Sequence, residues 1–120
     1  MAIMINKQDY INSINQNIEM VRGDTLEFNF QIVGADSTST FAFVVSEEYG
    51  DSPVITATSE SGISLVETSG DIKTYAVNIS PAQTAGLAVG IYYYNLVMYL
   101  NGTYTLMRGE FNILYEVKRA

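Results

Sequence analysis

Apolar and polar residues alternate along most of this chain, from about residue 18 onward. In the stretch "TLEFNFQIV", which begins at Thr25, the positions from Leu26 to Ile32 are apolar and polar in strict turn. This period of two predicts a β-strand with one buried face. The same pattern, interrupted by turn-forming residues, predicts further strands over residues 40–46, 54–59, 63–67, 72–79, 90–100 and 103–117.

The clearest break in this alternation is "SPAQTAGL", residues 80–87. Ser80, Pro81 and Gln83 fit a helix N-cap, a proline at the first helical position and a capping-box partner. Because the stretch is short, it predicts only a turn or two of helix before the penultimate strand.

The last two strands are predicted to form a hairpin. Asn101 and Gly102 lie between two β-rich runs, and an Asn-Gly pair favours the positive φ angles of a tight turn. Gly109, inside the last run, is expected to mark a β-bulge.

About seven short strands with almost no helix predict an all-β fold, a single immunoglobulin-like β-sandwich of antiparallel strands over residues 18–120. The segment "LAVGIYYY" supports this fold. Gly90 and Tyr92 follow Leu87 at the spacing of a tyrosine corner, in which a buried Tyr hydroxyl bonds to the backbone upstream. Tyr92 is the residue expected at that corner.

The first 17 residues have a different character. They are rich in Asn and Gln, and their helix propensity is poor. One interpretation is a flexible or edge-pairing terminal segment. The other is an N-terminal arm or docking segment, residues 1–17, that becomes ordered against another subunit because its apolar side chains need a surface to bury them. The candidate contact residues of such an arm are Ile3, Ile5, Tyr10, Ile11 and Ile14.

The strand predicted over residues 90–100 is apolar on both faces. With Tyr92 and Tyr94 turned inward, its outer face still carries mostly apolar side chains, whereas the outer face of a half-buried strand is normally polar. Either the N-terminal segment covers a central strand, or the face is a subunit interface, where Tyr and Met are enriched. The candidate interface residues on this face are Tyr93, Val97 and Tyr99.

Composition narrows the possible chemistry. The chain has 120 residues, 48% hydrophobic and 16% charged, which is typical of one folded globular domain. It contains no Cys and no His, so disulfides, thiolate metal sites and Ser-His-Asp catalysis are excluded.

The formal charge of the chain, −7, argues against a nucleic-acid partner, because binding to nucleic acid needs a basic face. No apolar run approaches the roughly 20 residues of a membrane span, and the N-terminus lacks the pattern of a signal peptide.

Candidate catalytic groups are few. Glu47, Glu48 and Asp51 cluster in "SEEYGDS", but their spacing does not match a calcium loop, and a solvated loop between strands is the expected role. No catalytic, metal-binding or cofactor-binding residue is therefore predicted, and the chain is not expected to be an enzyme. The nine tyrosines leave one alternative open, a carbohydrate- or host-surface-binding module with exposed aromatic side chains.

The tripeptide Arg22-Gly23-Asp24 matches the adhesion signal that integrins bind. It lies between the apolar run 18–21 and the strongest alternating strand. Gly23 supplies a backbone angle that other residues resist, and Asp24 can close a turn. We therefore interpret the tripeptide as the bend that begins the sandwich.

Three stretches together resemble a known family: "EMVRGDTLEFNFQI", "EEYGDSPVI" and "YAVNISPAQTAGLAVGIYYYNLVMYLNGTYTLMRGEFNI". Over roughly residues 18–117, the chain is similar to small immunoglobulin-like β-sandwich structural proteins of tailed bacteriophages and prophages, in the style of the N-terminal domain of baseplate upper proteins. The resemblance implies a non-enzymatic virion structural protein at the tail, baseplate or capsid surface, and it transfers no catalytic residues. The chain departs from the family's pattern because no long fibre, coiled coil or receptor-binding extension follows Val117, which favours an adaptor or decoration subunit over a receptor-binding protein.

The resemblance also implies the partners and the location. Other virion proteins are expected to bind the chain by protein–protein interaction in a homo- or hetero-oligomeric assembly. As the composition and charge above already indicate, no nucleic acid or membrane is expected as a partner, and no small-molecule substrate is expected. The expected location is the virion, after synthesis in the host bacterial cytoplasm without a signal peptide.

Overall fold

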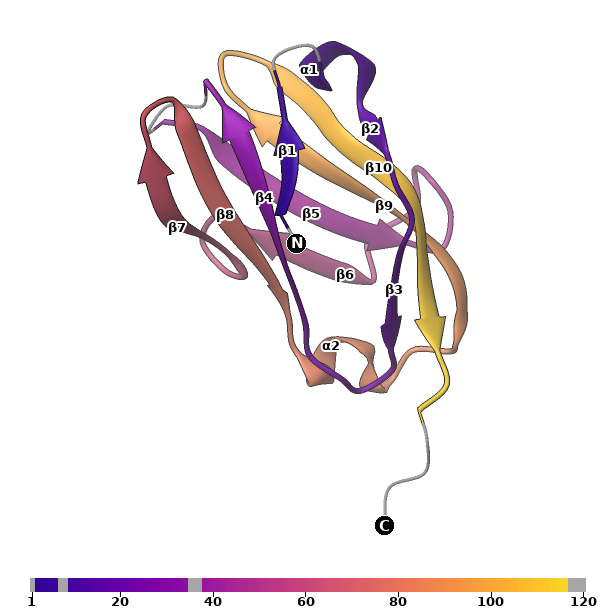
Figure 1. The fold of residues 1–120 in the computed structure, drawn as a ribbon. Helices are drawn as coiled ribbons and strands as arrows, with labels where there is room; N and C mark the ends of the chain where they lie inside the picture. Colours follow the sequence, from indigo (N-terminus) through magenta and orange to yellow (C-terminus); the bar gives the residue numbers. More distant parts are fainter. Residues whose placement is uncertain (1, 7–8, 35–37, 117–120) are drawn as a thin grey trace.

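The computed structural model describes residues 2–6, 9–34 and 38–116, which form a sandwich of two β-sheets (Figure 1). The predicted immunoglobulin-like β-sandwich is confirmed. Two short helices, α1 (Asp9–Asn12) and α2 (Pro81–Ala85), lie at opposite ends of it. The strands are β1 (Ala2–Ile5), β2 (Ile14–Asn15), β3 (Ile18–Val21), β4 (Leu26–Val33), β5 (Thr40–Ser46), β6 (Ile55–Thr58), β7 (Ile63–Ser69), β8 (Ile72–Ile79), β9 (Gly90–Tyr99) and β10 (Thr103–Leu114).

One sheet has the strand order β1-β4-β8-β7. The other has the order β2-β10-β9-β5-β6, with β3 also paired to β10. The seven strands from β4 to β10 correspond to the seven predicted runs, and their pairs are antiparallel. β1, β2 and β3 instead pair in parallel, with β4 or β10. The structure thus contains three short N-terminal strands besides the seven that the alternation predicts.

The buried faces of the predicted strands meet between the two sheets. Phe30 of β4 packs against Phe41 of β5 and Tyr75 of β8, with ring centroids 5.2 and 5.4 Å away. Phe43 of β5 continues this aromatic cluster to Tyr94 of β9, 5.3 Å away. Burial of such large rings removes much apolar surface from water and stabilises the packing of the two sheets.

Two local motifs form as the sequence predicts. Tyr92 is buried, and its hydroxyl donates to the carbonyl oxygen of Ala88 at 2.8 Å, which is the tyrosine corner. At the start of α2, the side-chain oxygen of Gln83 accepts a hydrogen bond from the backbone N–H of Ser80 at 2.9 Å. This bond is the reciprocal half of a capping box.

The Arg22-Gly23-Asp24 segment is a tight turn between β3 and β4. Gly23 has a φ of 82°, and the N–H of Asp24 donates to the backbone carbonyl three residues earlier at 3.1 Å. The N–H of Gly23 donates to the buried hydroxyl of Thr84 in α2 at 2.9 Å. Arg22 pairs with Glu116, with 2.8 Å between Nη2 and Oε1. The interpretation as a bend is confirmed, and the guanidinium is engaged within the chain.

The β9–β10 hairpin also forms. Its loop covers residues 100–102, one residue more than the Asn-Gly pair, and Asn101 has a φ of 50°. The irregularity in β10 lies between Thr105 and Met107, so the prediction of a bulge at Gly109 is wrong. This glycine pairs regularly with β9, and its role lies in a contact with a distant part of the chain, described below.

The N-terminal segment is part of the sandwich. β1 extends the first sheet, with Ile3 opposite Phe30 and Ile5 opposite Ile32. The side chain of Ile5 is 0% exposed, so it belongs to the core of this domain and is not available to a partner. α1 then leads to the other sheet, where β2 and β3 line the edge of β10. Residues 1–17 therefore do not project as a separate arm in their described part, and they pair with sheet edges.

Candidate functional site

The outer face of β9 is exposed to solvent and mainly apolar. β9 lies between β10 and β5, and buried residues alternate along it with outward ones. Ile91 and Tyr99, near its two ends, are 58% and 46% exposed, and Val97 is half-buried. Ala42 of β5 lies opposite Val97 and adds an apolar side chain. The outward orientation predicted for Tyr93, Val97 and Tyr99 is therefore confirmed.

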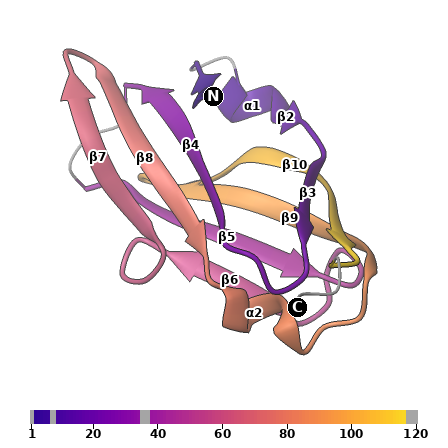
Figure 2. The same ribbon diagram turned by 60° about the horizontal axis from the view of Figure 1, so that its bottom comes forward.

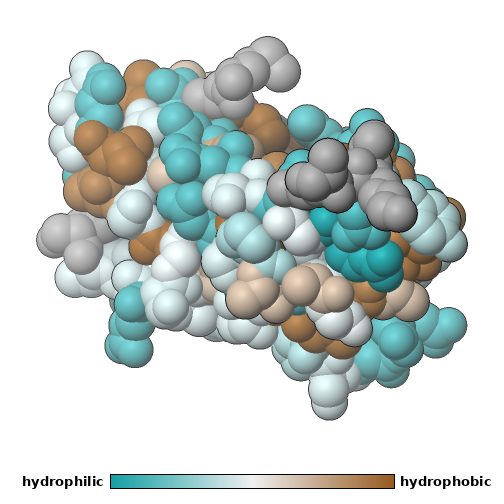
Figure 3. Space-filling model, turned by 90° about the horizontal axis from the view of Figure 1, so that it is seen from below, coloured by the Kyte–Doolittle hydropathy of each residue, from teal (hydrophilic) through white to brown (hydrophobic). Residues whose placement is uncertain are grey.

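No helix or strand of the described chain crosses this face (Figures 1 and 2). The two helices lie at the ends of the sandwich, and β1, β2 and β3 lie at sheet edges. The N-terminal segment therefore does not cover the outer face of β9, which was one explanation for its apolar character. Seen from below, exposed hydrophobic side chains form several small groups and no single broad patch (Figure 3).

A polar groove opens beside this face, close to Tyr93. The ring of Tyr49, from the loop between β5 and β6, lies against the ring of Tyr93, with 5.0 Å between centroids. The guanidinium carbon of Arg108 is 4.9 Å from the centroid of the Tyr49 ring, within the range of a cation–π contact. The Tyr49 hydroxyl donates to the carbonyl oxygen of Gly109 at 3.2 Å, which attaches the loop to β10.

The N-terminal segment also lines the groove, through residues on both sides of Gln16. A Cβ atom on Gly109 would come 2.4 Å from the carbonyl oxygen of Gln16, so only glycine allows the segment to approach β10 this closely. The N–H of Gln16 donates to the carbonyl of Arg108 at 3.0 Å, and the buried Tyr94 hydroxyl donates to the carbonyl of Gln16 at 2.5 Å. Burial raises the pKa of Tyr94 well above its usual value, so this hydroxyl keeps its proton at neutral pH.

The groove has a volume of about 560 Å³, which is within the range of roughly 300–1,000 Å³ that is usual for small-ligand sites. Its charged side chains are Arg108 and Glu110, whose charges cancel. Uncharged polar side chains supply most of the remaining lining. Besides Tyr49, Arg108 and Gly109, the groove is lined by Asn12, Ser13, Asn15, Asn17, Tyr93 and Glu110.

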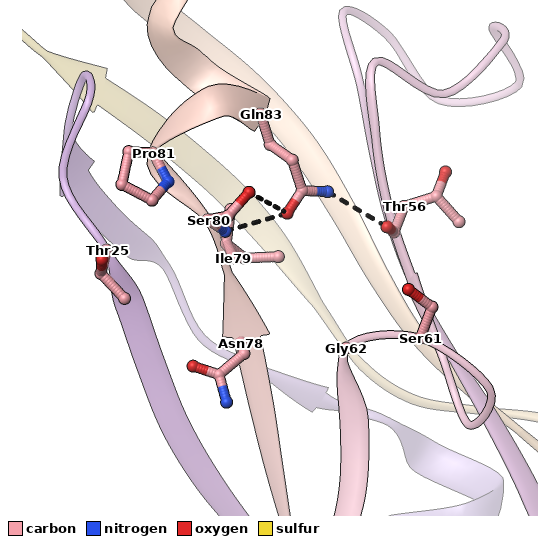
Figure 4. A pocket seen from close by; sticks show the side chains of 9 residues that line it. All are labelled: Thr25, Thr56, Ser61, Gly62, Asn78, Ile79, Ser80, Pro81 and Gln83. Carbon is pink, nitrogen blue, oxygen red and sulfur yellow. Dashed lines mark hydrogen bonds between the residues drawn. The ribbon is translucent and has the colours of Figure 1, made fainter.

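A second groove lies next to α2, with a volume of about 440 Å³ (Figure 4). The Gln83 side chain is bonded at both ends, its oxygen to the N–H of Ser80 and its nitrogen to the carbonyl of Thr56 at 3.2 Å. The second bond joins α2 to β6. The Gln83 amide is therefore engaged within the chain.

Three of the other predicted contact residues of the N-terminal segment pack against the core of this domain. Ile3, Tyr10 and Ile14 are partly buried against the core. The Tyr10 hydroxyl donates to the carbonyl of Val33 at 2.6 Å, and burial raises its pKa. The side chain of Ile11 lies outside the described residues.

Sequence reasoning missed Tyr49, Arg108 and the asparagines of the groove. The available signal was weak, since three asparagines within residues 12–17 and a tyrosine in a charged loop are common in exposed segments. Their proximity depends on the parallel pairing of β2 with β10, which the alternation does not predict.

The acidic loop is solvated, as predicted: Glu47, Glu48 and Asp51 are all exposed. Across residues 2–6, 9–34 and 38–116, no group of three Asp, Glu, Cys or His side chains has the geometry to hold a metal ion. Within the same ranges, none of the helices has the length and apolar character needed to cross a membrane.

Comparisons with known proteins show similarity in fold alone. No family model matches the chain, and no curated protein matches it. A family 123 glycoside hydrolase from Clostridium perfringens matches with a TM-score of 0.50 and 18% identity, over 93% of this chain. This chain spans only 26% of that hydrolase chain, and at this identity the likeness concerns the fold alone.

Two immunoglobulin domains match with lower scores. The Ig1 domain of mouse SynCAM 2 matches with a TM-score of 0.40 and 15% identity, over 85% of this chain and 94% of that domain. The extracellular domain of the voltage-gated sodium channel beta4 subunit matches with a TM-score of 0.38 and 10% identity, over 86% and 93% of the two chains.

Proposed function

We propose that the chain is a non-enzymatic structural protein of a tailed-bacteriophage virion. It acts as an adaptor or decoration subunit that docks on a larger tail, baseplate or capsid protein. The observation that carries this proposal is an outward-facing apolar row at the far end of β9 from the groove, formed by Val97 and Tyr99 with Ala42 of β5 beside Val97. The sequence resemblance to phage sandwich proteins supports the choice of partner.

This row suits a docking surface because it is held rigidly. Val97 is paired on one side with Ala42 of β5 and on the other with Thr105 of β10, so the backbone is ordered before any partner binds. A preformed surface loses little conformational entropy on association. Tyrosine at the end of the row adds a large side chain of a type that is enriched in interface cores.

The described grooves favour binding over catalysis. Among the residues that the structure describes, Glu110 is the only carboxylate that lines the groove beside Tyr49, and none lines the groove beside α2. Most glycoside hydrolases use a pair of carboxyl groups on either side of the bond that is broken. The fold likeness to one such enzyme is therefore not accompanied by its usual catalytic pair at these two grooves.

The docking proposal is tested by particle incorporation. Phage particles are prepared from genomes that encode the wild-type chain, Val97→Asp or Tyr99→Ser, and the amount of the chain per particle is measured by quantitative mass spectrometry. Val66→Asp is the matched control, because Val66 is 55% exposed on β7 of the other sheet and receives the same change. We expect both outer-face variants to reduce incorporation at least tenfold, and the control to leave it unchanged.

Thermal melting of each purified variant separates docking from folding. Tyr99→Ser removes a side chain from an exposed position, so it is expected to melt close to the wild type. Normal incorporation of a folded Tyr99→Ser and Val97→Asp chain would remove the outer face from the proposal. Absence of the wild-type chain from purified particles would overturn the assignment to a virion.

A further inference from the structure

We propose that the groove between Tyr49, Tyr93 and residues 12–17 binds an uncharged carbohydrate. This inference goes beyond docking on virion proteins and does not depend on it, because the groove lies at one end of the outer face. Tyr93 and Tyr99 are six residues apart on β9, which corresponds to about 20 Å along a strand. A chain bound to a particle through the Tyr99 end can therefore keep the groove available.

The charges of the groove favour a ligand without net charge. Arg108 and Glu110 lie two residues apart on β10 and point to the same side, and they form no ion pair with each other in the described structure. An anionic ligand would meet the carboxylate of Glu110, and a cationic one would meet the guanidinium of Arg108. Sugar hydroxyl groups both donate and accept, so they satisfy a guanidinium and a carboxylate at the same time.

The amides provide further donors and acceptors at fixed positions. The Asn17 side-chain oxygen accepts a hydrogen bond from the N–H of Glu110 at 3.0 Å, which fixes its orientation and directs its NH2 group away from that bond. Asn12 and Asn15 are exposed beside it. A polyhydroxylated ligand offers partners for this set of amides, whereas an aliphatic side chain of a protein partner would leave them unsatisfied.

The two tyrosines supply an aromatic surface on the opposite wall. Tyr49 is 44% exposed, although its hydroxyl is bonded to Gly109 and its ring packs against the ring of Tyr93. Tyrosine combines an apolar ring, which packs against the C–H faces of a sugar, with a hydroxyl that hydrogen-bonds. Apolar packing on one side and amides on the other match the mixed surface of a sugar ring.

The walls of the groove are formed before any ligand binds. Gly109 allows Gln16 to lie directly against β10, and the Tyr94 hydroxyl donates a hydrogen bond to the carbonyl oxygen of Gln16. The loop that carries Tyr49 is bonded to Gly109 from the other side. A ligand therefore orders little of the protein when it binds, which favours affinity for a small molecule.

The test begins with the purified full chain on an array of neutral oligosaccharides and of matched glycans carrying sialic or uronic acids. A neutral oligosaccharide that binds is then measured by titration calorimetry and by saturation-transfer NMR. We expect binding of neutral glycans, with at least a tenfold loss of affinity in Tyr49→Ala and in Arg108→Gln. Both side chains are exposed, so these variants are expected to fold.

Two controls separate this inference from the docking proposal. Thr56→Ala changes the groove beside α2, and Tyr99→Ser changes the docking end of the outer face; both are expected to bind the glycan as the wild type does. The inference is overturned if no neutral oligosaccharide binds at concentrations up to about 10 mM. It is also overturned if only acidic glycans bind, if folded Tyr49→Ala and Arg108→Gln bind normally, or if a protein is found to occupy the groove.

Discussion

Replacing Ile5 by alanine tests whether the N-terminal segment belongs to the core. Ile5 is fully buried and lies opposite Ile32 in the first sheet. The change removes roughly three buried carbon groups, each worth about 0.8 kcal/mol, which gives about 2.4 kcal/mol before any cavity is counted. With the cavity, isoleucine-to-alanine changes in cores cost about 2–5 kcal/mol.

The expected loss is large for a domain of 120 residues, whose total stability is of the order of 5–15 kcal/mol. Since 1 kcal/mol corresponds to roughly 3–5 °C at this size, we expect Ile5→Ala to lower the Tm by about 6–25 °C. Circular dichroism melting and urea denaturation measure the change. Met4→Ala is the matched control, because the neighbouring side chain on β1 is 40% exposed, and its loss is expected to cost less than about 1 kcal/mol.

Two outcomes would refute the placement of Ile5 in the core. If Ile5→Ala melts within about 2 °C of the wild type, the segment does not contribute to the core, and residues 1–17 act as a separable arm. A loss in Met4→Ala as large as that in Ile5→Ala would also refute it, because the effect would then not follow burial.

Two further predictions concern the groove and the buried tyrosines. Gly109→Ala places a Cβ 2.4 Å from the carbonyl oxygen of Gln16, so we expect a loss of about 1–3 kcal/mol in thermal melting and weaker glycan binding. Gly86→Ala, where a Cβ meets open space, is the control, and equal melting of the two variants would contradict the close approach. Burial raises the pKa of three tyrosines above the ordinary value of 10.0: Tyr10, Tyr92 and Tyr94. Above that value the unfolded chain loses these protons first, so the free energy of unfolding falls as pH rises, by up to about 1.4 kcal/mol per pH unit for each tyrosine. Their contribution is fully present below pH 10, and urea denaturation giving the same free energy at about pH 9 and pH 11 would contradict this account.

The features that local sequence determines were predictable. Alternation identified the strands from β4 to β10, because each buries one face regardless of its neighbours. Spacing within a few residues predicted a bond from the Tyr92 hydroxyl to the backbone upstream, which is made to Ala88, and the capping-box bond of Gln83 to Ser80. These interactions lie within four residues of one another, so no long-range information is needed.

The groove was not predictable, because it depends on contacts between distant segments. Gly109 illustrates the difference: a glycine inside a strand locally suggests a bulge, but here it makes room for Gln16, more than ninety residues earlier. Tyr49 and Arg108 come together through the order of β5, β9 and β10 in one sheet. The period of two determines which side a residue faces, and it does not determine which strands are neighbours.

The most direct test of the docking surface is hydroxyl-radical footprinting of the chain, free and on particles. Oxidation of Tyr99, on the outer face of β9, is compared with oxidation of Leu65, which is similarly exposed on β7 of the other sheet. The account predicts that particle-bound chains show several-fold less oxidation of Tyr99, with Leu65 unchanged. Equal oxidation of Tyr99 in both states, or protection of Leu65 in its place, would contradict it.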